Sequence, residues 1–363
     1  MADAGCQATV RTAAKGTRQE TFVLASGRRF PWMIAFCHAH GSINIRASAY
    51  VIVARFSALS DSTLHHPAPR SRAVHRLRFL RMMVSDMTRS VPPAPHHPEP
   101  GAWSADRVTA AWLGHATVLL NFFGVTVLTD PTLFPRCGIR IGPLTIGPKR
   151  YVACALKPRE LPPIDLVLLS HAHMDHLDLR SLRALPRDAV VVTAKATADI
   201  FRRIRFREVI ELDWQETREV DTPRGSVTVS AYPLRHWGAR LQYDDFRGYN
   251  AYVLERGGKR LCHMGDTART DASALGSRGP IDLIFAPIGA YHPWIRAHCT
   301  PEEALAMADE ARARFVMPIH HQTFKLSWEP MEEPIARFLT AIQGHPERLA
   351  LKEIGETFTL PGD

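Results

Sequence analysis

Four side chains of the kinds that bind metal ions fall within six consecutive positions of this 363-residue chain. They are His171, His173, Asp175 and His176, and they follow the apolar run Asp165–Leu169, which predicts a short buried strand. Neutral imidazole and carboxylate groups are the usual nitrogen and oxygen ligands of zinc. Because a tight loop after a strand directs alternating residues into one pocket, we expect the first two histidines to share one ion. The Asp-His pair then faces a second ion.

The remaining ligands of a two-metal site have to come from later in the chain. Three candidates are His236, Asp266 and His320, and each stands just after a predicted strand. Loops that leave neighbouring strands at the same edge of a sheet converge, so these side chains are expected to meet. Each residue taken alone is also consistent with a structural role. The ordered set, following the first cluster, favours a dinuclear metal centre.

The body of the chain alternates predicted hairpins with predicted helices. The expected strands are 108–112, 116–122, 125–128, 165–169, 189–192, 208–212, 226–233, 249–255, 259–263, 282–287 and 315–318. The expected helices are 178–185, 197–204, 300–314 and 334–343. Hairpins mixed with helices in one domain indicate an α/β (α+β) fold in which helices cover the sheets.

The first hundred residues differ from the rest in charge and in pattern. They hold 13 of the 45 basic residues but only 5 of the 36 acidic ones, and they show no sustained helix or strand period. They end in a proline-dense stretch, 91–100, which is typical of an extended linker. We expect residues 1–100 to be a basic, disordered extension, or a stretch that largely precedes the true initiator methionine, which would be Met82, Met83 or Met87. A transit-like leader is the third interpretation. Residues 101–363 are expected to form the catalytic domain.

The net charge of +9 therefore belongs to the N-terminal region, and the nearly neutral remainder gives no reason to expect a nucleic-acid partner. No apolar run reaches the 18 residues of a membrane span, and no secretion signal is visible. Six cysteines without a Cys-x-x-Cys pair are typical of a reduced protein. We expect a cytoplasmic location, and peripheral contact with the inner face of the membrane is left open.

Several further segments connect the chain to a known family, and most of them contain no metal ligand. They are Trp112–Thr117, Thr129–Pro131, Gly147–Arg150, Glu160–Asp165, Val209–Trp214, His236–Trp237, Gly265–Thr267, Pro287–Tyr291, Pro301–Ala304 and Ile319–Phe324. Between about residues 108 and 357 the chain resembles the metallo-β-lactamase-fold hydrolases. Among them it resembles the N-acylphosphatidylethanolamine-hydrolysing phospholipase D branch. The resemblance implies an αββα sandwich of two mixed sheets covered by helices.

The resemblance also assigns the ligands of two Zn²⁺ ions per chain. One ion is held by His171, His173 and His236, the other by Asp175, His176 and His320, and Asp266 bridges both. Asp130 corresponds to a buried aspartate that supports the ligand loops from behind. His298 stands where the family has a pocket histidine close to the phosphate, which implies catalytic and substrate-binding roles.

Two departures and one motif residue concern the pocket around these ions. Met174 stands where the family has an aromatic residue, so it is expected to contact substrate and to alter acyl-chain preference. His321 stands where a tryptophan is common. His115 belongs to the shared motif Gly114–Thr117, and a buried supporting role fits it better than that of a proton donor.

The function implied by the resemblance is zinc-dependent phosphodiester hydrolysis. A hydroxide that bridges ions about 3.5–4 Å apart attacks phosphorus. Asp266 and Asp175 orient this hydroxide, and N-acylethanolamine and phosphatidic acid are released. The expected partner is a phospholipid or another phosphodiester, and a homodimer is left open. A cytoplasmic sugar-phosphate lactonase with the same metals is the main alternative, although segments 147–150 and 287–291 favour the phospholipase. A catalytically silent metal-binding scaffold is disfavoured by the complete set of seven ligands.

Overall fold

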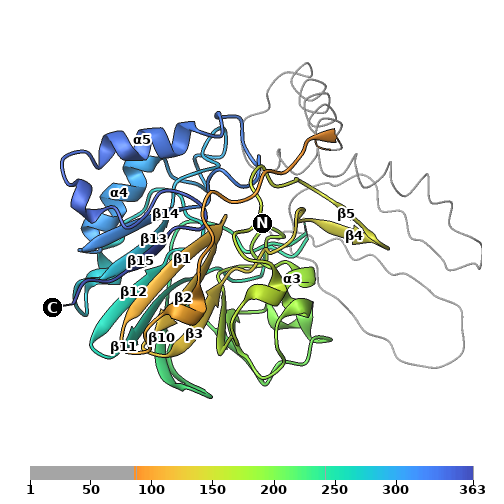
Figure 1. The fold of residues 1–363 in the computed structure, drawn as a ribbon, viewed down its shortest axis with the longest axis horizontal. Helices are drawn as coiled ribbons and strands as arrows, with labels where there is room; N and C mark the ends of the chain where they lie inside the picture. Colours follow the sequence, from red (N-terminus) through yellow and green to blue (C-terminus); the bar gives the residue numbers. More distant parts are fainter. Residues whose placement is uncertain (1–85, 87, 242, 363) are drawn as a thin grey trace, which may run out of the picture. The chain divides into compact units, whose positions relative to one another are not determined.

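The structure is a computed structural model, and it describes residues 86, 88–241 and 243–362. The prediction for residues 1–85 lies outside the described residues. Within them the chain forms two stacked sheets, and Figure 1 shows helices α4 and α5 beside the second sheet. No helix of the described residues is long and apolar enough to cross a membrane.

The first sheet has seven strands in the order β15-β1-β2-β3-β6-β7-β8. Their bounds are β1 Val108–Gly114, β2 Thr117–Phe122, β3 Val125–Thr129, β6 Leu166–Leu169, β7 Val190–Ala194, β8 Glu208–Leu212 and β15 Thr357–Thr359. Strands β1 to β3 form an antiparallel meander, whereas β3, β6, β7 and β8 run parallel. Every residue of β3, β6 and β7 is buried, as expected for strands that are covered on both faces.

The second sheet has six strands in the order β14-β13-β12-β11-β10-β9. Their bounds are β9 Thr217–Thr222, β10 Gly225–Tyr232, β11 Ala251–Arg256, β12 Lys259–His263, β13 Leu283–Pro287 and β14 Phe315–Ile319. Strand β10 pairs antiparallel with β11, and β11 with β12, so β10 runs in the same direction as the parallel strands β12, β13 and β14. A separate hairpin joins β4 (Ile139–Ile141) to β5 (Leu144–Ile146).

Alternating side chains of the second sheet supply two apolar cores. Leu283 and Phe285 point into the main core shared with the first sheet, whereas Ile284 points into a smaller core under the helices. Helices α4 (Pro301–Glu310) and α5 (Glu333–Ala341) cover that second face. Helix α3 (Leu179–Ala184) follows β6, and short 3-10 turns occur elsewhere among the described residues. The predicted fold of two mixed sheets covered by helices is confirmed.

Local sequence explains where the helices begin. Asp178 accepts hydrogen bonds from the backbone N–H groups of Arg180 and Ser181 at the start of α3. At the start of α4, Thr300 and Glu303 form a reciprocal capping box, and Pro301 fits the first turn. The prediction of a helix over 197–204 is wrong, since the chain makes only a 3-10 turn over Ala198–Phe201. The buried side chains of Phe201 and Ile204 have a spacing of three, which 3-10 and α-helical turns share.

The segment before the first sheet is attached to the domain. Arg89 donates hydrogen bonds to the carbonyls of Lys149 and Arg150, and the backbone N–H of His96 donates to the carbonyl of Ile354. A Cβ atom on Gly355 would lie 1.9 Å from the carbonyl oxygen of His96, so only glycine permits this close approach. The domain boundary at residue 100 stays a prediction, but the attachment begins before it.

Candidate metal centre

The predicted site residues all follow strands that run in the same direction within their sheet. In the first sheet, His115 follows β1, Asp130 follows β3 and the loop of residues 171–176 follows β6. In the second sheet, His236, Asp266, His298 and His320 lie in the loops after β10, β12, β13 and β14. Since these loops leave each sheet at one edge, residues far apart in sequence meet there.

The first group, which we call the histidine half, consists of His171, His173 and His236. His171 Nε2 lies 2.8 Å from His173 Nδ1, and His236 Nε2 lies 3.3 Å from the same atom. Together with a carboxylate oxygen of Asp266, their ligand atoms fall within 4.8 Å of one another. The structure therefore brings together the residues predicted for one ion.

The second group, the carboxylate half, consists of Asp175, His176 and His320. The Nε2 atoms of both histidines lie 3.7 Å from Asp175 Oδ2. Asp266 Oδ2 lies 3.1 Å from His176 Nε2 and 3.2 Å from His320 Nε2, and it lies 3.9 Å from His236 Nε2 in the other half. Asp266 therefore stands between the two halves, in the position that the family resemblance implies for a bridging ligand.

The backbone is bent into unusual conformations where the ligands are presented. His115, Asp130 and His320 have positive φ angles of 55°, 34° and 63°, although none is glycine. Gly265, with φ 62°, precedes the bridging aspartate, and a Cβ there would lie 2.7 Å from the Cβ of Ser170. Strained backbone of this kind concentrates at functional sites, where the surrounding structure holds it in place.

The two halves differ in their protonation. Burial lowers the pKa of His173 to about 3 and that of His236 to about 4, so both rings are neutral at pH 7. Burial also acts on His320, but the carboxylates of Asp266 and Asp175 outweigh it and raise its pKa to about 9. The same kind of pairing holds the pKa of His176 well above its usual range, chiefly through Asp266.

Hydrogen bonds on the far side of the rings fix which nitrogen faces the centre. His236 Nδ1 donates to the carbonyl of Ala297 at 2.9 Å, and His176 Nδ1 donates to Asp130 Oδ2 at 2.8 Å. Each ring thereby turns Nε2 toward the other ligands.

Buried polar atoms without partners provide a test of whether metal ions fit. His176 Nε2, both ring nitrogens of His320 and Asp266 Oδ1 are buried and form no hydrogen bond with any described residue. A buried polar group left unpaired costs about 1–3 kcal/mol. Imidazole and carboxylate atoms that face one another in this way match the ligand preference of divalent cations such as zinc.

Two residues that support the ligands, Ser170 and His263, were not predicted from the sequence, and both donate hydrogen bonds to Asp130. Asp130 accepts hydrogen bonds from Ser170 N and Ser170 Oγ, at 2.7 and 2.6 Å, and from His263 Nε2 at 2.9 Å. Asp130 and His263 are fully buried, and Asp130 contacts His176 as predicted for a residue behind the ligands. The available signal was position, since Ser170 immediately precedes the first ligand and His263 stands three residues before Asp266.

The remaining predicted residues lie around the two halves. His115 is buried and donates a hydrogen bond from Nε2 to Asp175 Oδ2 at 2.9 Å, which agrees with a supporting role. His298 Nδ1 lies 3.8 Å from Asp266 Oδ2 and forms no hydrogen bond with a described residue. Met174 is half-buried between two ligands, and its contact with substrate stays a prediction. His321 is buried with its ring centroid 4.4 Å from that of Trp112.

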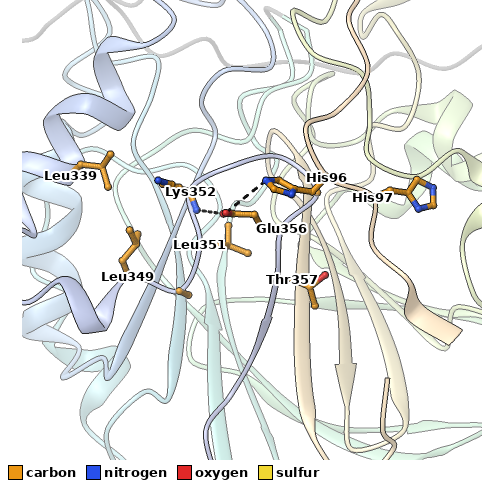
Figure 2. Close-up of a pocket in the computed structure, with 10 residues that line it drawn as sticks. His96, His97, Leu339, Leu349, Leu351, Lys352, Glu356 and Thr357 are labelled. Carbon is orange, nitrogen blue, oxygen red and sulfur yellow. Dashed lines mark hydrogen bonds and ion pairs between the residues drawn. The ribbon is translucent and has the colours of Figure 1, made fainter. Parts of the chain in front are cut away.

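A separate group of side chains of metal-ligand type consists of His96, Glu353 and Glu356. His96 and Glu356 line a surface cavity of about 610 Å³ (Figure 2). His96 Nε2 lies 2.8 Å from Glu353 Oε2, while Glu356 accepts hydrogen bonds from the backbone N–H groups of Lys352 and Glu353. These contacts fasten the segment before the first sheet to the turn before β15, and Lys352 lines the same cavity. We interpret this group as structural.

Comparison with known proteins identifies the family. Residues 126–321, more than half of the chain, match the model of the beta-lactamase superfamily domain. The chain belongs to the metallo-β-lactamase superfamily. Together with its curated relatives, this membership makes it a metal-dependent hydrolase. The superfamily predicted from the sequence is confirmed, and so is the fold.

Individual members of the superfamily resemble the chain over most of its length. An uncharacterized protein of Mycobacterium tuberculosis is 32% identical over 257 residues, which cover 68% of this chain and 67% of that protein. N-acyl-phosphatidylethanolamine-hydrolyzing phospholipase D 1 of Caenorhabditis elegans is 31% identical over 232 residues, covering 60% of this chain and 64% of the worm protein. The structure of Igni18, a metallo hydrolase from Ignicoccus hospitalis, aligns with a TM-score of 0.54 and 20% identity. It covers 70% of this chain and 99% of Igni18.

Proposed function

We propose that this metallo-β-lactamase superfamily member is a dinuclear zinc phosphodiesterase that cleaves phospholipids as a phospholipase D. The observation that carries the proposal is the convergence of seven ligand-type residues into two halves that share Asp266. The likeness to the worm phospholipase D, whose name describes hydrolysis of N-acylphosphatidylethanolamine, supports the choice of substrate class.

Two zinc ions held by these halves would polarise the phosphoryl oxygens and bring the pKa of coordinated water to about 7. The residues of the chain do the positioning. Pairing with His176 holds the pKa of both Asp175 and Asp266 well below its usual range despite their burial, so both carboxylates are ionised. An ionised carboxylate accepts a hydrogen bond from the attacking water and orients it toward phosphorus.

The proposed reaction is hydrolysis of a phosphodiester by one water molecule. A bond forms between the water oxygen and phosphorus, and the bond from phosphorus to the alcohol oxygen breaks. The alcohol leaves with the proton that the water gives up. With N-acylphosphatidylethanolamine, the alcohol is N-acylethanolamine and the phosphate stays on phosphatidic acid.

The proposal assigns contact with the phosphate to His298, whose Nδ1 lies 3.8 Å from Asp266 Oδ2. Burial lowers the pKa of His298 well below its usual range, so its ring is neutral at pH 7. A neutral imidazole carries one N–H, which can donate a hydrogen bond to a non-bridging oxygen of the phosphate. This protonation state favours stabilisation of developing charge over proton donation to the leaving alcohol.

A turnover panel with the purified full-length protein tests the proposal. Zinc-loaded protein is assayed with N-acylphosphatidylethanolamine in detergent, with the soluble diester bis(4-nitrophenyl) phosphate, and with a sugar-phosphate lactone. Metal content is measured alongside by mass spectrometry. We expect about two ions per chain and hydrolysis of both phosphodiesters. Turnover of the lactone alone favours the lactonase, and binding of metal without any turnover favours a silent scaffold; either result overturns the proposal.

A further inference from the structure

Exposed apolar side chains are concentrated on the loops that carry ligands. Eleven large hydrophobic side chains are exposed among the described residues. Six lie on three loops, namely residues 235–241 and 243–250 after β10, 288–300 after β13, and 320–332 after β14. We call these six the rim; they are Trp237, Leu241, Tyr243, Phe246, Ile295 and Trp328. Exposed apolar patches of this kind mark interaction surfaces more often than chance packing.

Contacts place Trp237 beside the ligands and connect the other two loops to the same region. The ring centroid of Trp237 lies 4.8 Å from that of His173 and 4.6 Å from that of His236. Ile295 stands two residues before Ala297, whose carbonyl accepts the hydrogen bond from His236. The backbone N–H of Trp328 donates to the carbonyl of His292, which joins the loops after β13 and β14.

The first of these loops is anchored to the loop of residues 171–176. Arg240 donates hydrogen bonds to the carbonyls of Ala172 and Leu177, at 3.0 and 2.8 Å. Tyr243 and Phe246, only a few residues further on, are 78% and 63% exposed. The loop therefore presents two aromatic side chains to solvent from a fixed base beside the ligands.

The charges between these side chains suit phosphate groups. Arg235 and Arg296 are exposed, and neither forms an ion pair with a described residue. Each lies within two positions of a rim residue, whereas the exposed carboxylates on the described parts of the three loops are Asp245 and Glu332, and Glu332 accepts a hydrogen bond from Gln322. Aromatic rings beside arginines are the combination that inserts at the boundary between acyl chains and headgroups of a bilayer.

We propose that the rim docks on a phospholipid bilayer and delivers headgroup phosphates to the metal centre. The inference rests on the proposed function, because it assigns a lipid as the substrate. A protein partner or a second copy seated on the rim would cover Trp237 and the ligands His173 and His236 that it contacts, whereas a bilayer itself supplies the substrate to them. The rim is therefore assigned to a lipid surface.

Co-sedimentation with vesicles tests the docking directly. Full-length protein is mixed with phosphatidylcholine vesicles, which carry no net charge, so the basic N-terminal region contributes little. The test variant is Tyr243→Ser/Phe246→Ser, and the matched control is Leu339→Ser, an exposed apolar residue of α5. We expect the double variant to lose at least about tenfold in partitioning, and the control to stay within about twofold of wild type. Turnover of bis(4-nitrophenyl) phosphate should not change in any variant.

A second comparison tests the arginines. With vesicles that contain one part phosphatidylglycerol to three parts phosphatidylcholine, Arg235→Gln/Arg296→Gln should bind about tenfold more weakly at low salt. The same variant should bind pure phosphatidylcholine like wild type.

The outcomes separate the docking surface from the proposed function. If wild type cleaves the soluble diester but binds neither vesicle, or if both serine variants bind alike, the docking inference is wrong and the proposed function stands. If wild type binds vesicles through the rim but cleaves no phosphodiester, the proposed function is wrong. Size-exclusion chromatography gives a further outcome. If wild type is an oligomer and Tyr243→Ser/Phe246→Ser is a monomer, the rim is an interface between copies and the docking inference is overturned.

Discussion

The two halves of the candidate metal centre both present ligand atoms, but the pKa values of their histidines are shifted in opposite directions. In the histidine half, burial holds the pKa of His173 near 3 and that of His236 near 4, so these rings are ready to donate lone pairs. In the carboxylate half, Asp266 and Asp175 raise the pKa of His320 to about 9. Without metal, protons balance the negative charges there. One half is therefore organised by burial, and the other by ion pairs that a metal ion must displace.

Support from the surrounding structure differs in the same way. The ring of His236 is oriented by a hydrogen bond to one backbone carbonyl, that of Ala297. The ring of His176 donates a hydrogen bond to Asp130, which also accepts hydrogen bonds from Ser170 and His263. Asp175 accepts a hydrogen bond from His115. The carboxylate half thus depends on a larger network of buried polar groups. Such networks are costly to break because removing one partner leaves another buried polar group without its hydrogen bond.

The largest effect is expected from the residue that both halves share. Asp266→Ala removes the carboxylate that lies within 4 Å of His176, His320 and His236. We predict that turnover of bis(4-nitrophenyl) phosphate falls at least about 10⁴-fold and that metal content drops below two ions per chain. Asp271→Ala, an exposed aspartate five residues on, is the control and should behave like wild type. Full activity in the Asp266→Ala protein would show that the halves act independently.

His298 offers a way to reduce catalysis while leaving both halves intact. Its ring lies 5.2 Å from that of His236 and 5.6 Å from that of His320, so it faces both halves. His298→Ala should retain both ions and lower kcat on the soluble diester by about 10²–10⁴-fold, because the phosphate loses a hydrogen-bond donor. His298→Asn, which keeps an N–H donor, should recover part of the loss. Loss of metal in the alanine variant would instead make His298 a support, and unchanged kcat would make it a bystander.

His263 sharpens the difference in support. His263→Phe keeps a buried ring but removes the hydrogen bond to Asp130, and with it one of the groups that fix His176. We expect zinc affinity of the carboxylate half to fall about 10–100-fold, while that of the histidine half changes little. Stepwise zinc titration against a chelator separates the two sites. Equal weakening at both sites would show that the network around Asp130 serves the whole fold and not one half.

The contrast between the halves also marks what sequence alone can predict. The His-x-His and Asp-His pairs are local, so their placement after the strand β6 was predictable from residues 165–176. The contributions of Ser170 and His263 were not, because a polar residue inside or at the end of a strand shows no sign of its cross-sheet partner. Strand β9 was missed because its pattern is mainly exposed and polar, and β15 because it has only three residues.

The smallest expected effect is a difference in pH dependence between the halves. His171→Ala leaves only the carboxylate half complete, and His320→Ala leaves only the histidine half. A metal ion needs a neutral imidazole, and His320, with a pKa of about 9, must lose a proton at pH 7. Zinc affinity of the carboxylate half should therefore rise about tenfold per pH unit for each proton released, until the pH passes about 9.

The histidine half should respond differently over the same range. With pKa values of about 3 and 4, His173 and His236 are already neutral at pH 6, so zinc affinity in the His320→Ala variant should stay nearly flat between pH 6 and 9. Chelator competition at pH 6, 7 and 8 measures both slopes, and equal slopes would contradict the contrast. Stability of the metal-free protein has the matching sign. The raised pKa of His320 stabilises the fold fully below its unfolded value of about 6.5, and this contribution is lost as the pH rises through about 9. A bound ion takes the place of that proton, so the zinc-loaded protein should not share this alkaline loss.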